Sequence, residues 1–382
     1  IGRLRPYKRR KPSLIIAVAG CIAQQKGPDI IERMPHVDIV LGTHQLHRIS
    51  EIVDEKIRLR KPSIHTDFSD TIPSMDIIPD PGLISPSHRA YINIMQGCDN
   101  YCSYCIVPYV RGRELSRDHA GIIHEVALHA SRGVKEIFLL GQNVNSFSGG
   151  CSFSSLLREI SSIDGIERIR FTTSHPKDMG HDLIACFAEL EKLCSHIHLP
   201  FQSGSDAVLK LMNRQYTKST YLDLIHRLKQ ARPDMAFSAD VIVGFPGESD
   251  ADYHDTLDLM EQVRFDVLYS FKYSPRPGTK AAELFDSIPL EVKTHRLREL
   301  QALQRKITLE NNRSRLGKVY SVLVDGEGTR HEGQVHGRTV QNTIINFMGE
   351  KSLIGRSTEV RVTKANPNSL TGELYTPLSD KA

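Results

Sequence analysis

Three closely spaced cysteines are the residues of this chain with the most specific chemical meaning. Cys98, Cys102 and Cys105 stand in the segment Gly-Cys-Asp-Asn-Tyr-Cys-Ser-Tyr-Cys, residues 97–105. Three thiolates at this spacing can hold three irons of a 4Fe–4S cluster, whereas ferredoxin-type runs supply four thiolates and close the cluster. No fourth cysteine follows in this run, so one iron would stay open to a small molecule. The spacing therefore predicts a cluster at which chemistry takes place.

A zinc knuckle is the competing interpretation of these thiols. Structural zinc sites combine two Cys-x2-Cys pairs, or cysteines with histidines at set spacing. Only His119 and His124 follow nearby, and they form no matching pair. Tyr104, directly before the last cysteine, also suits packing against an adenine ring. We therefore favour the iron–sulfur cluster.

Length and composition predict a cytoplasmic protein of two or three domains. The chain has 382 residues, 40% of them hydrophobic, and no apolar run approaches the ~20 residues of a membrane helix. No signal peptide is visible, and because the first residue is Ile1 instead of Met we expect a fragment or a processed form. Seven irregularly spaced cysteines suit a reducing compartment.

The charge pattern leaves the nature of the partner open. A net charge of +4 permits an anionic partner but does not require one. The basic run at residues 3–11 could contact nucleic acid, and it could equally be an ordinary solvated segment.

Hydrophobic patterning predicts an α/β chain with three structured regions and a linker. We place the boundaries at 1–62, a Pro-containing linker at 63–85, a core at 86–315 and a small all-β barrel at 316–380. In the first region we expect a strand over 13–20 that ends at Cys21, a helix over 24–34 and a strand over 37–42. The core shows six strand–helix repeats, which indicate a parallel sheet, open or barrel-like. Its strands are expected at 91–96, 136–140, 168–173, 196–201, 236–244 and 267–273.

One glycine-rich turn follows the fifth expected core strand. In parallel barrels, binding sites gather at the carboxyl ends of the strands. Gly244 and Gly247 would let the backbone approach a ligand closely, with Glu248 beside them. The alternative is a plain strand-to-helix turn in which the helix dipole favours Glu248.

Two further strand ends carry polar side chains. Gly141, Gln142 and Asn143 end the second strand, and amide side chains both donate and accept hydrogen bonds. Gln202 and Ser203 end the fourth strand. Residues 203–206 also read as a helix N-cap, and the two roles can coexist.

The cysteine triplet resembles the signature of the radical S-adenosylmethionine (SAM) superfamily. The resemblance implies a partial (β/α)6 barrel whose open iron chelates the amino and carboxylate groups of SAM, which is cleaved to a 5′-deoxyadenosyl radical. It also implies adenine-side contacts from Gly244, Gly247 and Glu248, and ribose contacts from Gln202 and Ser203. The second-strand end would contact the methionyl amine. Many members carry Gly-Gly-Glu there, so the Gly-Gln-Asn of this chain leaves that contact open.

Four longer segments resemble one family within this superfamily, the tRNA methylthiotransferases. They are Val-Arg-Gly-Arg-Glu-Leu-Ser-Arg at 110–117, Gly-Gln-Asn-Val-Asn-Ser at 141–146, Thr-Ser-His-Pro at 173–176 and Ser-Phe-Lys-Tyr-Ser-Pro-Arg-Pro-Gly-Thr at 270–279. The resemblance covers essentially the whole chain. It implies transfer of a methylthio group to C2 of N6-isopentenyladenosine at tRNA position 37. One SAM would methylate a sulfur of an auxiliary cluster, and a second would be cleaved.

The resemblance also implies partners. We expect a tRNA substrate, a reducing electron donor of flavodoxin or ferredoxin type, no membrane and a monomeric enzyme. The alternatives are a related methylthiotransferase that acts on threonylcarbamoyladenosine in tRNA or on a ribosomal protein, and an RNA-binding protein with a structural or sensory cluster.

A second 4Fe–4S cluster is implied for the N-terminal region. The segment Gly-Cys-Ile-Ala-Gln at 20–24 matches the family segment that holds the last of three cysteine ligands, so Cys21 is the candidate. Its two partners are expected before the first residue of this chain. Cys186 and Cys194, on or beside an apolar helix face, and Cys151, in a Gly/Ser loop, are not expected to replace them.

The C-terminal barrel resembles the TRAM domain, which implies RNA binding. Arg330, Arg338 and Arg356 are the candidate phosphate contacts. Nearby acidic residues partly balance their charge, so a mixed polar surface is the alternative. Arg111 and Arg113 could face tRNA phosphate or the SAM carboxylate, or form structural ion pairs.

Overall fold

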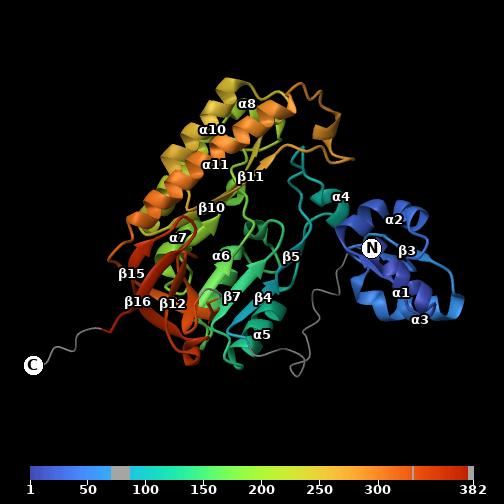
Figure 1. The fold of residues 1–382 in the computed structure, drawn as a ribbon, viewed down its shortest axis with the longest axis horizontal. Coiled ribbons are helices and arrows are strands. Elements are labelled where there is room, and N and C mark those ends of the chain that lie inside the picture. Colours follow the sequence, from blue (N-terminus) through green and yellow to red (C-terminus); the bar gives the residue numbers. More distant parts are fainter. Residues whose placement is uncertain (70–86, 329–330, 377–382) are drawn as a thin grey trace, which may run out of the picture.

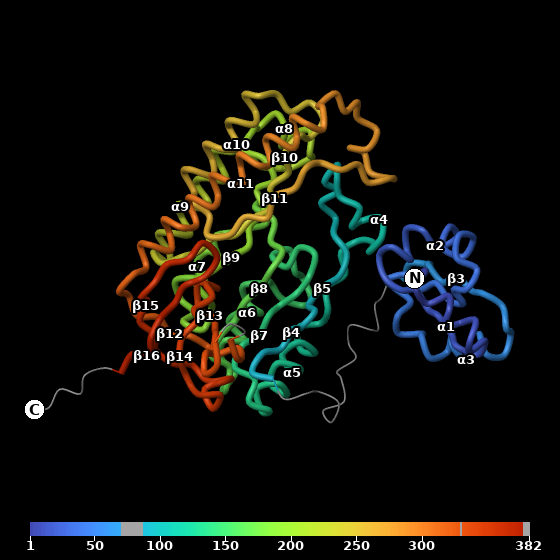
Figure 2. The backbone as a smooth tube through the Cα atoms, viewed as in Figure 1, coloured from blue at the N-terminus to red at the C-terminus, as the bar shows by residue number. Residues whose placement is uncertain are grey.

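The structure, a computed structural model, describes residues 1–69, 87–328 and 331–376. Three parts follow one another along the chain: an N-terminal unit, a half-barrel and a small closed barrel (Figure 1). The N-terminal unit lies beside the short helix α4, and the closed barrel lies at the other end of the half-barrel (Figure 2).

The N-terminal unit is a three-stranded parallel sheet with helices. Its strands are β1 (Ala17–Ala19), β2 (Ile39–Leu41) and β3 (Ser63–His65), in the order β1-β2-β3. The helices are α1 (Arg5–Arg10), α2 (Cys21–Arg33) and α3 (Ile49–Leu59), with the 3-10 turns η1 (Gly2–Leu4) and η2 (Leu46–Arg48). Helix α2 begins earlier than expected because Gly20, at φ 102°, turns the chain directly from strand into helix.

The expected linker overlaps this sheet at its start. Strand β3 pairs with β2 along residues 63–65. Beyond the strand, the Gln24 amide donates to Thr66 O at 2.6 Å, and the Gln45 amide donates to Asp67 O at 2.8 Å. Residues 63–67 therefore belong to the N-terminal unit. Positions 70–85 of the expected linker lie outside the described residues.

The half-barrel consists of six parallel strands, as the strand–helix repeats predict. They are β4 (Arg89–Asn93), β7 (Glu136–Leu140), β8 (Arg168–Phe171), β9 (His196–His198), β10 (Ala236–Val243) and β11 (Val267–Lys272). The sheets β4-β7-β8 and β9-β10-β11 meet at a parallel bridge between Ile169 and Leu193. Two short strands, β5 (Met95–Gln96) and β6 (Leu115–Ser116), form an antiparallel pair beside them.

Helices cover the outer face of the half-barrel (Figure 1). They are α5 (His119–Ala130), α6 (Phe153–Ser161), α7 (His181–Glu189), α8 (Asp206–Leu211), α9 (Lys218–Ala231), α10 (Asp250–Val263) and α11 (Leu290–Arg313), and the shorter α4 (Val107–Arg111) follows the cysteine loop. Three 3-10 turns accompany them: η5 (Val144–Ser146), η6 (Pro176–Asp178) and η7 (Lys280–Glu283). Ser205, Thr217 and Ser249 each cap a helix by accepting a bond from its first turn.

The C-terminal part is a closed five-stranded barrel. Its strands are β12 (Val319–Glu327), β13 (Gln334–Thr339), β14 (Ile344–Met348), β15 (Ser357–Ala365) and β16 (Leu370–Leu374), with the 3-10 turn η8 (Lys351–Leu353). The order is β12-β13-β14-β16-β15. The sequence predicts barrel strands at 318–324, 332–335, 343–347 and 358–363 but not β16, because its sequence Leu-Thr-Gly-Glu-Leu lacks the strong apolar alternation of its neighbours.

Two buried arginines of the half-barrel hold this closed barrel. Arg168 and Arg170 lie at the start of β8 and are almost fully buried. Both guanidinium groups donate to main-chain carbonyls of the closed barrel, namely those of Ser321, Arg338, Thr339 and Val340, at 2.6–3.1 Å. The closed barrel is therefore docked at the amino ends of the parallel strands.

A buried ion-pair network continues this interface. Glu136 accepts from Arg89 at 2.6 Å and from Arg170 at 2.8 Å, and Arg89 also donates to Asp325 of the closed barrel at 2.8 Å. Burial by itself raises the pKa of Glu136 and of Asp325. Arg170 and Arg89 outweigh this at Glu136, and His88 and Arg89 do so at Asp325, so both pKa values are lowered.

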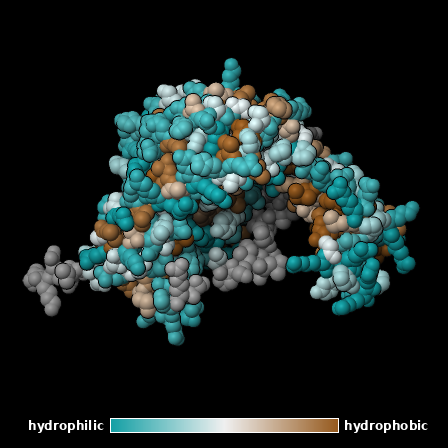
Figure 3. All heavy atoms as spheres, turned by 45° about the horizontal axis from the view of Figure 1, so that its top comes forward, coloured by the Kyte–Doolittle hydropathy of each residue, from teal (hydrophilic) through white to brown (hydrophobic). Residues whose placement is uncertain are grey.

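Within the described ranges, no helix combines the length and apolar character needed to cross a membrane. The face drawn in Figure 3 is mostly hydrophilic, and it is hollowed between the N-terminal unit on the right and the rest of the molecule.

Candidate active site

The cysteine loop, residues 97–105, begins directly after β5, beyond the carboxyl end of the first core strand, β4, at the carboxyl edge of the half-barrel. Gly97 has φ +80°, and a side chain there would overlap the carbonyl of Arg113. Cys98 N donates to Gly112 O at 3.3 Å. The loop is therefore folded back against the segment that follows α4, and glycine permits this close approach.

The three thiols lie in a mostly buried setting. Cys102 is buried, and Cys98 and Cys105 are half-buried. Burial raises the pKa of Cys98 and raises the pKa of Cys105 to about 11, and the nearby Cys102 adds to both shifts. The sulfurs are thus close enough to interact electrostatically, and metal binding would have to deprotonate them.

The arrangement fits a cluster better than a single ion. Within the described part of the chain, no three His, Cys, Asp or Glu side chains are grouped as a one-ion site. A 4Fe–4S cluster instead takes one thiolate at each iron, so the sulfurs need not converge on one point. Three thiols on one tight loop meet that requirement.

The second-strand end holds the cysteine loop in place. Gln142 Oε1 accepts from Gly97 N at 2.8 Å. Met95 Sδ lies 3.2 Å from Gln142 N and 3.4 Å from Asn143 N, and a side chain at Gly141 would come within 2.5 Å of this sulfur. The sequence singled out residues 141–143 as ligand contacts. In the structure, the amide oxygen of Gln142 and the space at Gly141 are occupied by the protein itself.

Asn143 differs from its two neighbours. Its side chain is buried and donates to Asp178 at 2.8 Å, but its Oδ1 has no hydrogen-bond partner among the described residues. A buried acceptor without a donor is uncommon in folded proteins. Within the described ranges, Asn143 therefore keeps one buried acceptor unpaired beside the cysteine loop.

The two candidate residues that follow the fourth core strand, β9, have different roles in the structure. Gln202 has φ +65°, and the parallel bridge to Val241 fixes its backbone. Ser203 is fully buried, and its hydroxyl accepts from Ser205 N at 3.2 Å. Ser205, rather than Ser203, caps α8. Gln202 lines the cavity described below, whereas Ser203 serves the turn.

The glycine-rich turn after β10 is held by a distant arginine. Gly244 and Gly247 have φ values of +68° and +88°. Glu248 is buried and accepts from Gly244 N at 2.7 Å and from Arg296 of α11 at 2.6 Å, while its Oε1 has no partner in the described chain. Burial raises the pKa of Glu248, which the Gly244 N–H and Arg296 offset only in part. The Glu248 carboxyl group fixes the turn through one oxygen, and its other oxygen is buried without a hydrogen-bond partner among the residues that the structure describes.

A cavity of about 770 Å³ lies beside the cysteine loop. Tyr104 and Gln202 line it, together with Ile242 of β10 and Phe271 and Lys272 of β11. Aromatic and apolar walls with a few polar groups are typical of small-molecule sites, and the volume suits a nucleoside-sized ligand. Tyr104 also packs with Phe245 and Tyr273 in a hydrophobic cluster. The site thus offers the aromatic surface that the sequence predicts for an adenine ring.

The N-terminal unit docks directly onto α4, the helix that follows the cysteine loop. Thr43 Oγ1 donates to Val110 O at 2.6 Å, and His44 Nε2 lies 2.9 Å from Arg111 O. Cys21 opens α2, which packs against α4. The structure therefore packs the helix that begins at Cys21 against the helix that follows the cysteine loop.

The remaining cysteines have the settings that the sequence predicts. Cys186 and Cys194 are buried, and Cys186 Sγ lies 3.7 Å from Ser154 O. Cys151 is half-buried in the loop before α6 and packs against the core.

The candidate RNA contacts are separated in the structure. Arg356 is exposed, whereas Arg338 lies 3.5 Å from Asp325 and contacts Asn342 at the interface with the half-barrel. Arg330 lies outside the described residues. Arg113 is exposed and 3.4 Å from Asp99, which is a weak surface ion pair.

Sequence reasoning missed Arg214, Thr43 and His44. The guanidinium of Arg214 donates to Cys102 Sγ at 3.3 Å. No local motif marks these residues, because each meets the cysteine loop or α4 from a distant part of the chain.

Comparison with known proteins agrees with this geometry. The family model for the radical SAM superfamily matches residues 92–260, and the model for the TRAM domain matches residues 313–375. The tRNA-2-methylthio-N(6)-dimethylallyladenosine synthase of Syntrophotalea carbinolica is 48% identical over 379 residues, covering 98% of this chain and 86% of that protein. The protein of the same name from Geotalea uraniireducens is 51% identical over 371 residues, covering 96% and 84%.

A solved structure shares the fold at much lower identity. The cobalamin-dependent S-adenosylmethionine radical enzyme OxsB, with aqua-cobalamin and S-adenosylmethionine bound, superimposes with a TM-score of 0.53 at 12% identity. The match covers 79% of this chain and 45% of OxsB.

Proposed function

Because this chain belongs to the tRNA-2-methylthio-N(6)-dimethylallyladenosine synthase family of radical SAM enzymes, we propose that it adds a methylthio group to C2 of N6-isopentenyladenosine at position 37 of tRNA. The observation that carries this proposal is the coincidence of near-complete similarity to these relatives with an intact three-cysteine loop beside a nucleoside-sized cavity.

The protein residues have distinct tasks in this proposal. Cys98, Cys102 and Cys105 hold three irons of a 4Fe–4S cluster, and Tyr104 and Gln202 bind SAM in the adjoining cavity. When bound, the cluster and SAM supply the radical and the methyl group. The protein orients these groups and excludes water from the cavity.

The inner face of the half-barrel suits an extruded base. Asp240 pairs in register with Tyr269, and Ile242 with Phe271, so these side chains share one face of the sheet. Tyr269 and Phe271 are 54% and 52% exposed on that face, and the Tyr269 ring packs edge-on against His198. Bases splayed out of RNA loops are commonly stacked on such aromatic rings.

Further parts of the proposal concern partners and location. The TRAM barrel contributes to tRNA binding, with Arg356 as its exposed phosphate contact. A reduced flavodoxin or ferredoxin supplies electrons, Cys21 contributes to a second 4Fe–4S cluster, and the enzyme works in the cytoplasm as a monomer. Size-exclusion chromatography with light scattering tests the monomer.

Nucleoside mass spectrometry of tRNA tests the reaction. In cells that lack the gene, 2-methylthio-N6-isopentenyladenosine should vanish while N6-isopentenyladenosine accumulates, and the wild-type gene should restore it. Cys102→Ala should fail to restore it. Cys186→Ala, which removes a buried thiol away from the site, should succeed. Persistence of the methylthio nucleoside in the deletion strain would refute the proposed substrate.

A further inference from the structure

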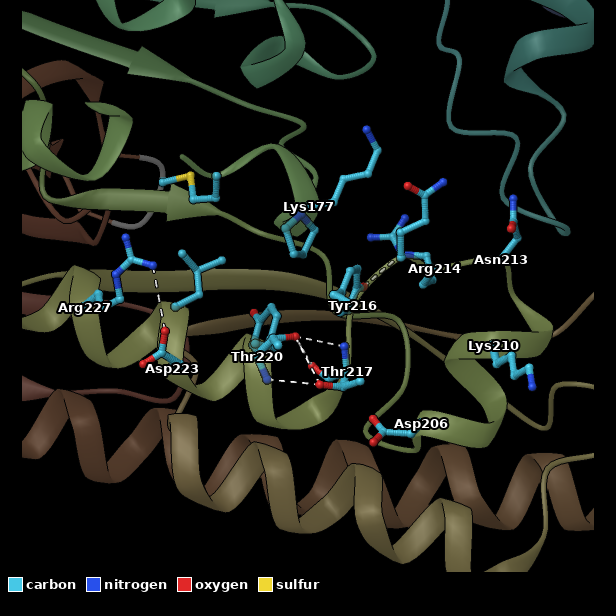
Figure 4. Close-up of a pocket in the computed structure, with 15 residues that line it drawn as sticks. Lys177, Asp206, Lys210, Asn213, Arg214, Tyr216, Thr217, Thr220, Asp223 and Arg227 are labelled. Carbon is cyan, nitrogen blue, oxygen red and sulfur yellow. Dashed lines mark hydrogen bonds and ion pairs between the residues drawn. The ribbon is translucent and has the colours of Figure 1, made fainter. Parts of the chain in front are cut away.

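Arg214 reaches the cysteine loop from the segment between α8 and α9. All three guanidinium nitrogens donate hydrogen bonds: Nη1 to Cys102 Sγ at 3.3 Å, Nη2 to Pro200 O at 2.9 Å and Nε to Tyr216 OH at 2.8 Å. Figure 4 shows Arg214 and Tyr216 joined in this way at the edge of a groove of about 820 Å³ on the outer side of the half-barrel. The arginine is therefore locked in one orientation behind Cys102.

The charge of this arginine needs a partner. Arg214 is only 9% exposed, and its guanidinium stays protonated in proteins. No carboxylate within the described ranges lies within ion-pair distance of it. A buried charge without a counter-charge is strongly unfavourable.

Of the three described groups that accept hydrogen bonds from Arg214, the Cys102 sulfur is the one suited to balance its charge. Pro200 contributes a neutral carbonyl, and burial raises the pKa of Tyr216, which keeps its hydroxyl neutral. The Cys102 sulfur is a proposed ligand of the 4Fe–4S cluster, which would bring negative charge to this hydrogen bond, and hydrogen bonds to ionised groups are about twice as strong as neutral ones. The geometry thus places a fixed, buried cation directly at one ligand sulfur of the proposed cluster.

We propose that Arg214 is a positioning residue for the cluster: its guanidinium holds the Cys102 sulfur by a hydrogen bond and raises the reduction potential of the SAM-binding cluster. The inference rests on the proposed cluster at Cys98, Cys102 and Cys105. Reduction adds one negative charge to the cluster, and a fixed cation nearby stabilises the reduced form. Hydrogen bonds to cluster sulfurs and burial are recognised determinants of the potential.

The test is a redox titration of the purified full-length holoenzyme, followed by electron paramagnetic resonance. The signal of the SAM-binding cluster is identified by its change when SAM is added, and the titration itself is run without SAM. In Arg214→Met, the ratio of reduced to oxidised cluster at the wild-type midpoint should fall at least tenfold. For one electron, tenfold corresponds to ~59 mV. Arg214→Lys keeps the positive charge and should show a smaller shift.

Asn213→Gly is the matched control. Asn213 adjoins Arg214, and its amide donates to Asn100 O at 3.3 Å and to Tyr101 O at 3.0 Å, so its loss loosens the loop without changing charge. Glycine also retains the left-handed backbone, φ +57°, of this position. The midpoint should stay at the wild-type value. A shift as large as that of Arg214→Met would show that loop distortion, not charge, sets the potential, and it would overturn the proposal.

Iron content separates the remaining outcomes. Arg214→Met with wild-type iron and a wild-type midpoint would overturn the role of Arg214 and leave the proposed function intact. If neither Arg214 variant retains wild-type iron, the residue serves loop folding, and the proposal is also overturned. A wild-type holoenzyme with no SAM-sensitive cluster would instead remove the proposed function itself.

Discussion

Gln142 and Met95 show how much of the site depends on single side chains that are not themselves ligands. The Gln142 side chain accepts from the first amide of the cysteine loop, and the Met95 sulfur accepts from the two amides that follow Gly141. Both contacts join the end of the second core strand, β7, to strand β5 and the start of the cysteine loop. The position of the thiols is therefore determined by a neighbouring strand as well as by the loop itself.

Gly141→Ala tests this dependence. The added methyl group would lie 2.5 Å from Met95 Sδ and 3.1 Å from Val144 Cγ1, so the methionine has to move and give up its two amide contacts. Overpacking of this kind costs about 1–3 kcal/mol. We expect a lower free energy of unfolding, measured by chemical denaturation, and a lower iron content after reconstitution.

Gly121→Ala provides the control for the same chemical change. Gly121 lies in α5, and a methyl group there has its nearest neighbour at 3.9 Å. Alanine is favoured over glycine in helices by up to about 1 kcal/mol, so stability should rise slightly or stay level. Equal destabilisation by both substitutions would contradict the role assigned to Met95.

Individual site residues were predictable from the sequence when a local pattern carried them. The cysteine triplet and the glycines at 244 and 247 have patterns of that kind, and the structure places them at the carboxyl edge of the half-barrel. The engagement of Glu248 by Arg296, 48 residues away, has no local signature. The same holds for Arg214 at Cys102, because tertiary folding alone creates the contact.

At the scale of elements, α4 connects the N-terminal unit to the cysteine loop. Thr43 and His44 follow β2 and bind the last carbonyls of α4, and Gly112, just after α4, accepts from Cys98 N. A shift of the N-terminal sheet would therefore be transmitted to the cysteine loop through a few bonds. The parts of the chain that carry Cys21 and Cys98 are held in fixed relation by these contacts.

Thr43→Val should uncouple SAM cleavage from product formation. Valine keeps the shape of threonine but removes the donor to Val110 O, which leaves a buried carbonyl unpaired. Misplacement of reacting groups by ~1 Å can cost up to ~100-fold in rate. We expect the yield of methylthiolated tRNA per 5′-deoxyadenosine to fall roughly tenfold, measured by mass spectrometry of both products.

Gln25→Ala removes a different contact between the same two parts. The Gln25 amide donates to Pro277 O at 3.1 Å at an exposed position, so its loss should leave the product ratio unchanged. A normal ratio in Thr43→Val would show that the N-terminal unit is held by other contacts.

Element boundaries were predictable where periodicity was strong and local. The sequence predicts a helix over 250–263, and α10 spans these residues because Ser249 caps it and its apolar face is regular. Strands β3 and β16 were missed. Each is short, and each is a strand because a partner pairs with it: β2 in one case, β14 and β15 in the other. Pairing over long separations leaves little trace in a single sequence.

At the scale of the whole molecule, the two barrels meet at the end opposite to the cysteine loop. The lowered pKa values of Glu136 and Asp325 make their contribution to stability pH-dependent. A carboxyl whose folded pKa lies below its unfolded value stabilises the protein above the unfolded pKa, about 4. That contribution is lost as the pH falls through the folded pKa.

Asp325→Asn should therefore reduce the loss of unfolding free energy that occurs between pH 7 and pH 3. Asp325 is the carboxylate that strand β12 of the closed barrel contributes to the network, and its side chain is 12% exposed. Removing one partner of a buried ion pair costs about 3 kcal/mol or more near pH 7. Denaturant unfolding at pH 7 and at pH 3 measures both effects. An unchanged difference between the two pH values would show that Asp325 does not contribute.

Arg356→Gln and Arg338→Gln should separate RNA contact from domain docking. Arg356 is exposed, so its loss should weaken tRNA binding and reduce the slope of log affinity against log salt by about 1. Arg338 is bonded to Asn342 and lies near Asp325, so its loss should act mainly on stability. Fluorescence anisotropy across a salt series measures the first effect, and identical slopes for Arg356→Gln and wild type would count against the contact.

The docking of the closed barrel through Arg168 and Arg170 has a consequence for how the molecule can change. Both arginines recognise main-chain carbonyls, which every amino acid presents in the same way. Side chains on the outer surface of the closed barrel can therefore change by mutation while the barrel keeps its position on the half-barrel. A barrel of the same backbone that keeps Asp325 but otherwise differs in sequence could be grafted onto this enzyme, so that recognition of nucleic acid evolves independently of radical chemistry.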